Sequence, residues 1–246
     1  MDMFVIPGRK CLGRKVTEWR INMKRNLMQK REDAMLSLLA IEEAWQELAA
    51  LKLTDLDPET TAVVFVDVIE GFVNIGPLSS NRALDIIEPV KQLNEKTRGW
   101  HKIYFRDCHT GDSAEFSAYV PHCLAGTAET ELIKELAPDE GERSYQIFKN
   151  CTNGFMAEGF QKWLTAHPQV TNFIITGLVT DICVMTFALT LKTYFNEKNT
   201  VSRLMVPLST VETFDLPLTN HQAELMNTFA VYNMQMNGIE IYREFE

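Results

Sequence analysis

The segment Val170-Thr-Asn-Phe-Ile-Ile-Thr176 leads directly into Gly177-Leu-Val-Thr-Asp-Ile-Cys-Val184, and this junction decides the fold. Its first half is a short apolar run of the kind found in buried parallel strands. Its second half predicts a strand-to-helix turn, with Cys183 at the start of the helix, where free helix N–H groups favour a thiolate. The helix is indicated by apolar residues that share one face: Val184, Phe187, Ala188, Leu191 and Phe195.

Strand and helix patterns alternate on both sides of this junction, which is typical of a parallel sheet covered by helices on both faces. Amphipathic stretches at 83–93 and 155–164 separate some of the strands. We therefore expect a three-layer α/β/α sandwich with a six-stranded parallel sheet. The predicted strands are 61–67, 102–107, 145–149, 170–176, 203–208 and 229–233.

A helical extension precedes the first predicted strand. Pro58 closes the linker, so we expect two parts, a basic arm with an amphipathic helix at 1–58 and an α/β domain at 59–246. An apolar stripe of this kind is expected to pack on the body or on a neighbouring subunit. The stripe consists of Met35, Leu38, Ile41, Trp45 and Leu48.

Charge is divided unevenly along the chain. Residues 1–31 hold nine Lys or Arg against Asp2 and Glu18, a net charge of +7, so the net −9 of the whole chain leaves −16 for the remainder. An acidic body argues against nucleic acid as a partner, and the arm is expected to dock on the acidic body of its own or another subunit, which favours a homo-oligomer.

The cellular setting follows from cysteine usage and hydropathy. Five cysteines without regular spacing and no signal peptide favour a reducing cytoplasm over a disulfide framework. The apolar runs are too short for a transmembrane helix, so no membrane partner is expected.

Four chemically complementary residues end or follow four predicted strands: Asp67, Asp107, Lys149 and Cys183. Ligands of open α/β sheets bind outside the carboxyl ends of strands, so these groups are expected to converge. An isolated cysteine would more often be a buried structural residue. Here Asp67 can serve as base and acid, Lys149 can stabilise anions, and the N–H groups of Val179 and Cys183 can form an oxyanion hole.

A second group of residues has the composition of a metal site. Asp107, His109, Glu115 and His122 supply two imidazoles and two carboxylates, a mixture suited to zinc, with manganese or iron as alternatives. The competing interpretation gives Asp107 and His122 structural roles and leaves Glu115 exposed.

Several of these motifs occur together in a known family. Over roughly residues 60–235 the chain resembles the isochorismatase-like cysteine hydrolases, and among them the nicotinamidases. The motifs that carry the resemblance are Asp67-Val-Ile-Glu-Gly-Phe72, Pro121-His-Cys-Leu-Ala-Gly-Thr127, Lys149 and the segment 177–184. The resemblance implies a cis peptide bond at Leu178–Val179. It also implies the four metal ligands above and a substrate pocket formed by Phe72, Leu78, Tyr119 and Leu178.

By this resemblance the chain hydrolyses nicotinamide to nicotinate and ammonia through a cysteine thioester, with a divalent ion orienting the pyridine ring, in NAD salvage. Departures from the common pattern at Cys108, Tyr119 and Ile182 concern ring size and substituents. Two alternatives stay open. One is a metal-independent cysteine amidohydrolase acting on a small acyclic amide of the ureido or maleamate type, and the other is a non-catalytic assembly protein that uses the basic arm.

Overall fold

The computed structural model describes residues 18, 20, 22–23, 30–136, 138 and 143–246. The chain divides into two compact units, Met1–Ala44 and Trp45–Glu246, which are treated separately below. Most of the predicted basic arm lies outside the described residues.

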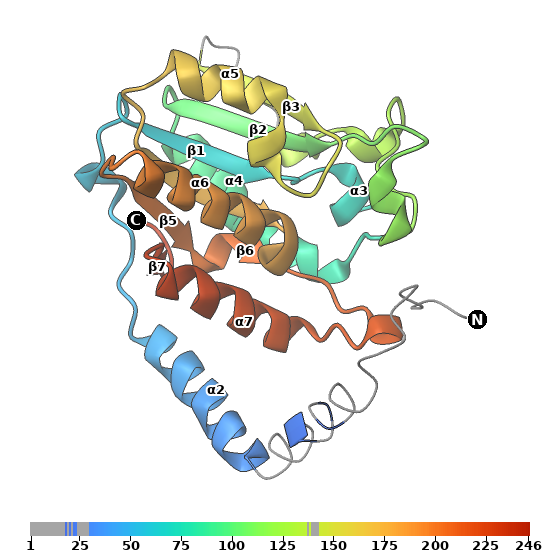
Figure 1. Ribbon diagram of the computed structural model, residues 1–246. Coiled ribbons are helices and arrows are strands. Elements are labelled where there is room, and N and C mark those ends of the chain that lie inside the picture. Colours follow the sequence, from blue (N-terminus) through green and yellow to red (C-terminus); the bar gives the residue numbers. More distant parts are fainter. Residues whose placement is uncertain (1–17, 19, 21, 24–29, 137, 139–142) are drawn as a thin grey trace. The chain divides into compact units, whose positions relative to one another are not determined.

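The second unit is built on a parallel sheet (Figure 1). The strands follow the order β3-β2-β1-β4-β5-β7, β6 pairs with β4, and all six pairings are parallel. The first five predicted strands are confirmed. Their observed bounds are β1 Thr61–Val66, β2 His101–Asp107, β3 Ser144–Lys149, β4 Asn172–Leu178 and β5 Arg203–Pro207, followed by β6 Val211–Glu212 and β7 Glu240–Tyr242.

The sixth predicted strand is wrong. Residues 229–233 belong to helix α7 (Ala223–Met236), and the edge strand beside β5 is the short β7. A five-residue apolar run cannot distinguish strand from helix by periodicity alone. The burial pattern of α7 is helical, because the buried residues Thr228, Val231 and Met234 are three positions apart and Ala223 lies two turns before Ala230.

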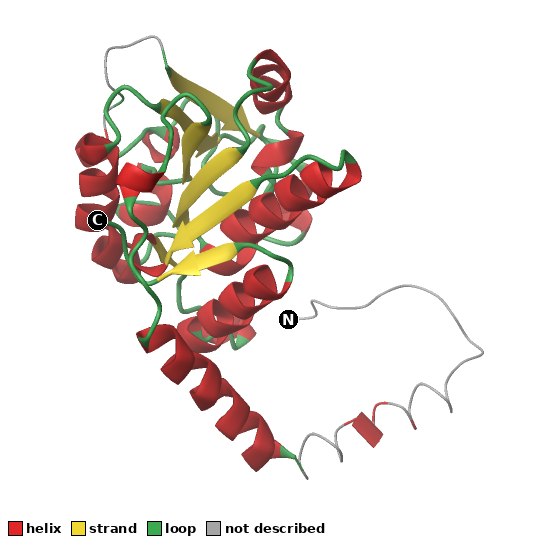
Figure 2. Ribbon diagram, turned by 90° about the vertical axis from the view of Figure 1, so that its left-hand side faces the viewer, coloured by secondary structure: helices red, strands yellow, loops and turns green. Residues whose placement is uncertain are grey.

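Helices cover both faces of the sheet, as the sequence predicted (Figure 2). One core layer joins α5 (Glu158–Ala166), α6 (Met185–Glu197) and α7 to one face, and the other joins α3 (Glu70–Val73) and α4 (Ile87–Lys96) to the opposite face. Shorter helical turns are Leu53–Asp55, Asn81–Ile86, Ala114–Ser117, Ala128–Thr130, Lys134–Leu136, Gly154–Met156, Leu208–Thr210 and Pro217–Thr219. A π-helical turn, Thr180–Val184, connects β4 to α6.

Helix α2 (Arg31–Gln46) begins in the first unit, and none of its residues is buried. At its carboxyl end Trp45 belongs to the second unit, where its Nε1 lies 3.3 Å from Gln235 Oε1. The following segment adds to the sheet edge, since Leu51 is buried and its N–H donates to Glu244 O. Residues 45–58, which the sequence grouped with the extension, thus belong to the second unit.

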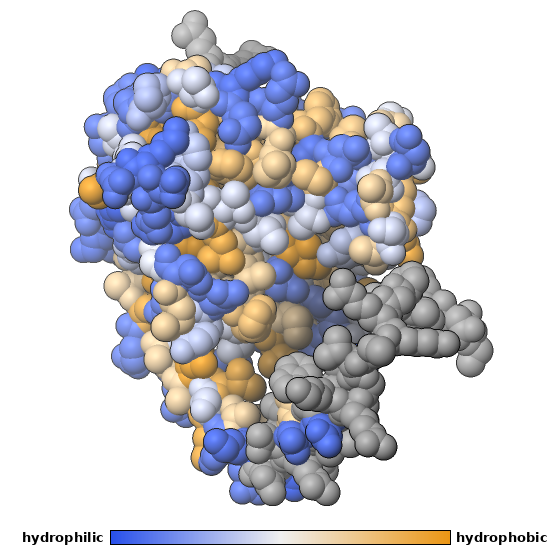
Figure 3. All heavy atoms as spheres, in the orientation of Figure 1, coloured by the Kyte–Doolittle hydropathy of each residue, from blue (hydrophilic) through white to orange (hydrophobic). Residues whose placement is uncertain are grey.

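Apolar side chains are exposed along α7, among polar ones (Figure 3). The large exposed hydrophobic residues are Leu225, Phe229, Tyr232 and Met236. The expected homo-oligomer stays a prediction. No helix in the described part of the chain is long and apolar enough to cross a membrane.

Gly177 lies near the end of β4, where its backbone packs so closely against β1 that a side chain has no room. Its φ is +114°, and an added Cβ would lie 2.1 Å from the carbonyl oxygen of Val66, the residue beside it in the sheet. We expect Gly177→Ala to lower the free energy of unfolding by at least about 2 kcal/mol, because backbone strain and a backbone clash add. Gly111→Ala, where an added Cβ meets nothing within 4 Å, is the matched control for chemical denaturation. Equal midpoints would contradict this account.

Candidate active site

Asp67 begins the site immediately after β1. Its side chain is fully buried, and its backbone is left-handed, with φ at 50°. Non-glycine residues hold such a conformation where surrounding structure enforces it, often at functional sites. The Asp67 N–H donates to Phe105 O, which anchors the turn to β2.

Lys149, the last residue of β3, joins the predicted catalytic residues. Its Nζ lies 2.8 Å from Asp67 Oδ2, 2.9 Å from Asp107 Oδ1 and 3.8 Å from Cys183 Sγ. Burial opposes the charge on Lys149, but Asp107 and Asp67 outweigh burial and raise the pKa of Lys149 well above its usual value. Lys149 is therefore a cation held between two carboxylates and the sulfur.

The two carboxylates around Lys149 have different protonation behaviour. Burial is the largest influence on both and favours the neutral acid. At Asp107, Lys149 and the neighbouring histidines outweigh burial and hold the pKa well below its usual range. At Asp67, burial and the charge of Asp107 outweigh Lys149 and raise the pKa to about 7. Asp67 is thus suited to exchange protons near neutral pH.

Cys183 lies inside the π-helical turn and is 6% exposed. The sequence expectation of a thiolate is wrong for the free protein. Burial, reinforced by Asp67 and Asp107, raises the pKa of the Cys183 thiol well above its usual value despite the opposing effect of Lys149. Any attack by this sulfur would require the proton to leave, and the Asp67 carboxylate is a neighbouring acceptor. The expected cis peptide bond is present at Leu178–Val179.

Three of the four predicted metal ligands form a buried cluster beside this group. The potential ligand atoms of Asp107, His109 and His122 lie within 4.8 Å of one another. Asp107 Oδ2 is 3.0 Å from His109 Nε2 and 3.2 Å from His122 Nε2. His109 Nε2 is buried and out of hydrogen-bonding alignment, so it has no hydrogen-bond partner among the described residues.

The outer nitrogens of both imidazoles are fixed by acceptors. His122 Nδ1 donates to Val120 O at 2.8 Å, and His109 Nδ1 lies 3.2 Å from Asn150 Oδ1, which also accepts from the backbone N–H of Thr110. In the neutral rings both Nε2 lone pairs therefore face the Asp107 carboxylate. One carboxylate and two imidazole nitrogens that converge in this way fit a divalent ion.

The pKa of His109 agrees with a site that favours positive charge. Burial lowers the pKa of His109, but the Asp107 carboxylate outweighs burial and the pKa is raised. The position therefore favours positive charge. Asn150 was not foreseen as the partner of His109, although its place directly after a strand end could have indicated it.

Glu115, the fourth predicted ligand, has another partner. Its carboxylate accepts from the backbone N–H of Thr152, at 3.0 and 2.9 Å for the two oxygens, and from the Thr152 hydroxyl. Within the described chain it does not join the Asp–His–His cluster, although it lines the same pocket. Its role as a ligand stays a prediction.

A pocket that is partly open to solvent lies next to Cys183. Of the predicted wall residues, Phe72, Leu78 and Tyr119 line it, whereas Leu178 is buried and is not found among its described lining residues. Sequence reasoning missed Thr152 and Phe214, whereas Ile182, noted as a departure that concerns the ring, does line the pocket. The remaining lining residues are Asp107, Glu115, His122, Val179 and Cys183.

Phe214 carried no usable sequence signal, because it lies in an irregular loop after the two-residue strand β6. His221 Nε2 lies 2.8 Å from Asp181 Oδ2, and both side chains are largely buried. Asp181 belongs to the turn Thr180–Val184 that carries the predicted nucleophile Cys183, called the nucleophile turn below.

Comparison with known proteins identifies the family. The isochorismatase domain matches residues 61–193, more than half of the chain. The chain belongs to the isochorismatase family. Nicotinamidase 1 of Arabidopsis thaliana is 30% identical over 209 residues, which cover 74% of this chain and 85% of that protein. The chain is therefore a nicotinamidase-like member of a hydrolase family.

Solved isochorismatase-like structures share the fold. N-carbamoylsarcosine amidase from Thermoplasma acidophilum superposes with a TM-score of 0.61 at 24% identity, covering 76% of this chain and 98% of that one. Pyrazinamidase of Pyrococcus horikoshii, solved in complex with zinc, gives a TM-score of 0.59 at 21% identity, covering 74% and 98%.

Proposed function

We propose that this protein hydrolyses nicotinamide to nicotinate and ammonia through a thioester on Cys183, in cytoplasmic pyridine-nucleotide salvage. The observation that carries the proposal is the juxtaposition of two groups beside one pocket, whose lining includes Cys183, Asp107 and His122. An Asp67–Lys149–Cys183 group stands beside the Asp107–His109–His122 cluster. The relationship to a plant nicotinamidase supports the substrate.

The first step forms the carbon–sulfur bond. Cys183 transfers its S–H proton to Asp67, and the sulfur attacks the carboxamide carbon as the carbonyl π electrons move to oxygen. Backbone N–H groups of Val179 and Cys183 are proposed to hold that oxyanion. Lys149 stays protonated and stabilises the anionic sulfur during proton transfer, which suits its position near Asp67 and Cys183.

The second step breaks the carbon–nitrogen bond. The oxyanion re-forms the carbonyl as the Asp67 proton moves to the departing nitrogen. Ammonia is released, and a thioester on Cys183 remains. Water then attacks the thioester carbon, Asp67 takes a proton from the water, and the carbon–sulfur bond breaks to release nicotinate and return a proton to Cys183. One carboxylate with a pKa of about 7 can serve in each proton transfer.

Asp107, His109 and His122 are proposed to hold one divalent metal ion, with zinc favoured and manganese or iron as alternatives. The ion would supply an electrophilic centre that a pyridine nitrogen can ligate. The zinc complex of the Pyrococcus horikoshii pyrazinamidase supports this choice. Phe72, Tyr119 and Phe214 would enclose a flat ring in the same pocket.

The test is ammonia release from a panel containing nicotinamide, pyrazinamide, N-carbamoylsarcosine and maleamate, together with metal analysis of the purified protein. Nicotinamide and pyrazinamide should react, and the protein should carry close to one metal ion per chain. Turnover of the acyclic amides alone, by metal-free protein, would move the assignment to the metal-independent amidohydrolase. A folded protein inactive on the whole panel would favour the assembly role.

The pH profile should show one essential base. Asp67 must be ionised to accept the thiol proton, and its pKa is raised to about 7, chiefly by burial. We expect kcat/KM for nicotinamide to fall about tenfold per pH unit below pH 7 and to level above it. Steady-state rates between pH 5 and 9 check this. An acid limb near pH 4, the value for an exposed carboxyl, would exclude Asp67 as the base.

A further inference from the structure

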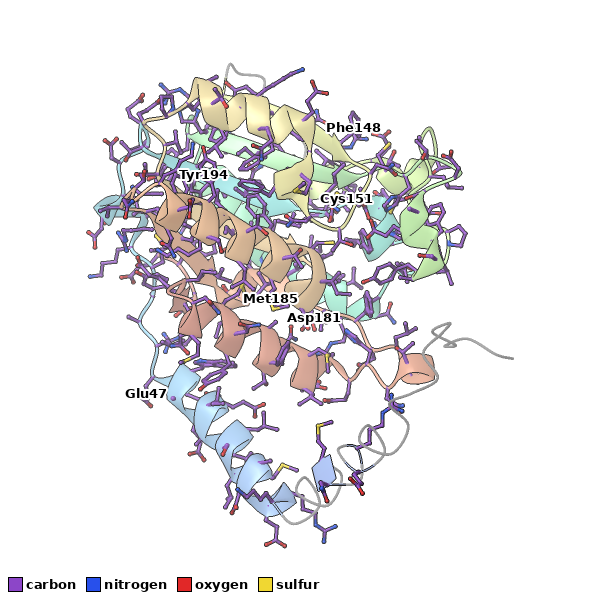
Figure 4. All side chains as sticks on the ribbon, viewed as in Figure 1. Glu47, Phe148, Cys151, Asp181, Met185 and Tyr194 are labelled. Atoms are coloured by element: carbon purple, nitrogen blue, oxygen red, sulfur yellow. The ribbon has the colours of Figure 1, made fainter. Side chains whose placement is uncertain are left out.

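A loop links the pocket wall to the nucleophile turn. The loop spans 213–221, contains Phe214 in the wall, and is closed by paired backbone hydrogen bonds between Leu216 and His221. Two of its side chains contact Asp181, which lies two residues before Cys183. Thr213 Oγ1 donates to Asp181 Oδ1 at 2.6 Å, and His221 Nε2 lies 2.8 Å from Asp181 Oδ2. Figure 4 labels Asp181 at the amino-terminal end of α6.

His221 also fixes the backbone of Phe214. Its Nδ1 lies 2.9 Å from Phe214 O, and the two rings are 4.9 Å apart. A carbonyl oxygen only accepts, so Nδ1 must carry a proton. His221 therefore joins the carbonyl of Phe214 to the carboxylate of Asp181. Loss of His221 or Asp181 removes a bond between side chains that are only 15% and 8% exposed.

Contacts that do not involve Asp181 also hold the loop. Glu212, immediately before the loop, accepts from Arg82 at 3.2 Å, and Arg82 also contacts Glu224 at the start of α7. Asp215 accepts from the backbone N–H of Ala223. With those contacts intact, the Asp181 contacts decide how closely Phe214 approaches the turn that carries Ile182 and Cys183.

We propose that Asp181 and His221 are positioning residues that fix Phe214 opposite the reacting sulfur and so limit which ring substituents the pocket admits. The proposal rests on the proposed function for the substrate class, an aromatic carboxamide. The pair touches no reacting atom. It acts by joining two walls of the pocket, Phe214 from the loop and Ile182 from the nucleophile turn.

Kinetics on a substrate series test this assignment. His221→Ala should raise the KM for nicotinamide about tenfold or more and change kcat less than about threefold, because ring contacts are lost while the catalytic groups stay in place. The kcat/KM for 5-methylnicotinamide relative to nicotinamide should rise at least about fivefold. Asp181→Asn should act in the same direction, and the double variant should be little worse than either single one. His221→Gln, which can keep one of the two bonds, should recover part of the loss.

His167→Ala is the matched control. His167 is also bonded through both ring nitrogens, to Trp163 O and the Tyr145 hydroxyl, but it precedes β4 and so lies at the opposite end of the sheet from the pocket. Its KM values should equal those of the unmodified protein. If His221→Ala does not fold, Thr213→Val removes a single bond to Asp181 and should shift the same ratios by a smaller factor.

A second readout does not depend on turnover. Peptide mass spectrometry can follow alkylation of Cys183 by iodoacetamide and by the bulkier N-phenyl iodoacetamide. Release of Phe214 should raise the bulky-to-small rate ratio at least about threefold in His221→Ala and leave it unchanged in His167→Ala. If nicotinamide is not a substrate but this ratio shifts, the proposed function fails and the positioning role stands. Unchanged ratios and KM values in folded His221 and Asp181 variants would overturn the positioning role.

Discussion

Cys183→Ala is expected to remove nicotinamide turnover, with a loss of at least about 10⁴-fold in kcat, because no other nucleophile forms the thioester. The fold should survive. The substitution deletes one sulfur atom from a side chain that is 6% exposed, so the melting temperature should shift by only a few degrees. Single-turnover assays of ammonia release, with melting curves, make the measurement.

Cys151→Ala is the matched control for Cys183→Ala. Cys151 is half-buried on the segment after β3, and its thiol donates to Asn153 O rather than joining the catalytic group. Its activity should stay within about threefold of the unmodified protein. Retention of even a tenth of the activity in Cys183→Ala would exclude the thioester route. Lys149→Ala and Asp67→Asn should each lose at least about 10²-fold, which is the scale of single acid–base and electrostatic groups.

The sequence predicted the convergence of the proposed catalytic residues for a simple geometric reason. Parallel strands end at one edge of a sheet, so Asp67, Asp107 and Lys149, placed at the ends of neighbouring strands, had to meet. Cys183 joins them because β4 adjoins β1. Residue type and strand order together were enough to predict that these four side chains lie close to one another.

The protonation state of Cys183 could not be predicted in the same way. The helix-terminus argument considered only local backbone, whereas burial and the charges of Asp67 and Asp107 raise the pKa of the thiol. Those contributions come from side chains more than 70 positions away in the sequence. The misassigned sixth strand has a related cause, since tertiary packing decided the structure of residues 229–233 and their local apolar pattern did not.

The pocket wall was predicted in part. Phe72 and Tyr119 lie close in sequence to the metal or catalytic motifs, and the motifs indicated them. Phe214 enters from a distant loop, and its position depends on the contacts of His221 and Asp181. A side chain placed by such long-range polar contacts has no local periodicity that reveals its function.

Removal of the proposed metal ion is expected to abolish nicotinamide hydrolysis. Dialysis against a strong chelator should reduce the rate at least about 10²-fold, and added zinc, manganese or iron should restore it. His109→Ala and His122→Ala should each lower the retained metal, measured by elemental analysis, at least about tenfold, because each deletes an Nε2 that faces Asp107.

Glu115→Ala tests whether Glu115 contributes to metal binding in the way that Asp107, His109 and His122 are proposed to do. The Glu115 carboxylate bonds Thr152, so its removal should reduce metal retention less than either histidine substitution. Cys183 should react with iodoacetamide at a similar rate in metal-free protein, because Asp67 and Lys149 surround its sulfur whether or not an ion is bound. Full nicotinamide turnover by demonstrably metal-free protein would refute the metal assignment for Asp107, His109, Glu115 and His122. A loss of metal in Glu115→Ala equal to that in His122→Ala would instead show that Glu115 is a full ligand, and that its bond to Thr152 yields when the ion binds.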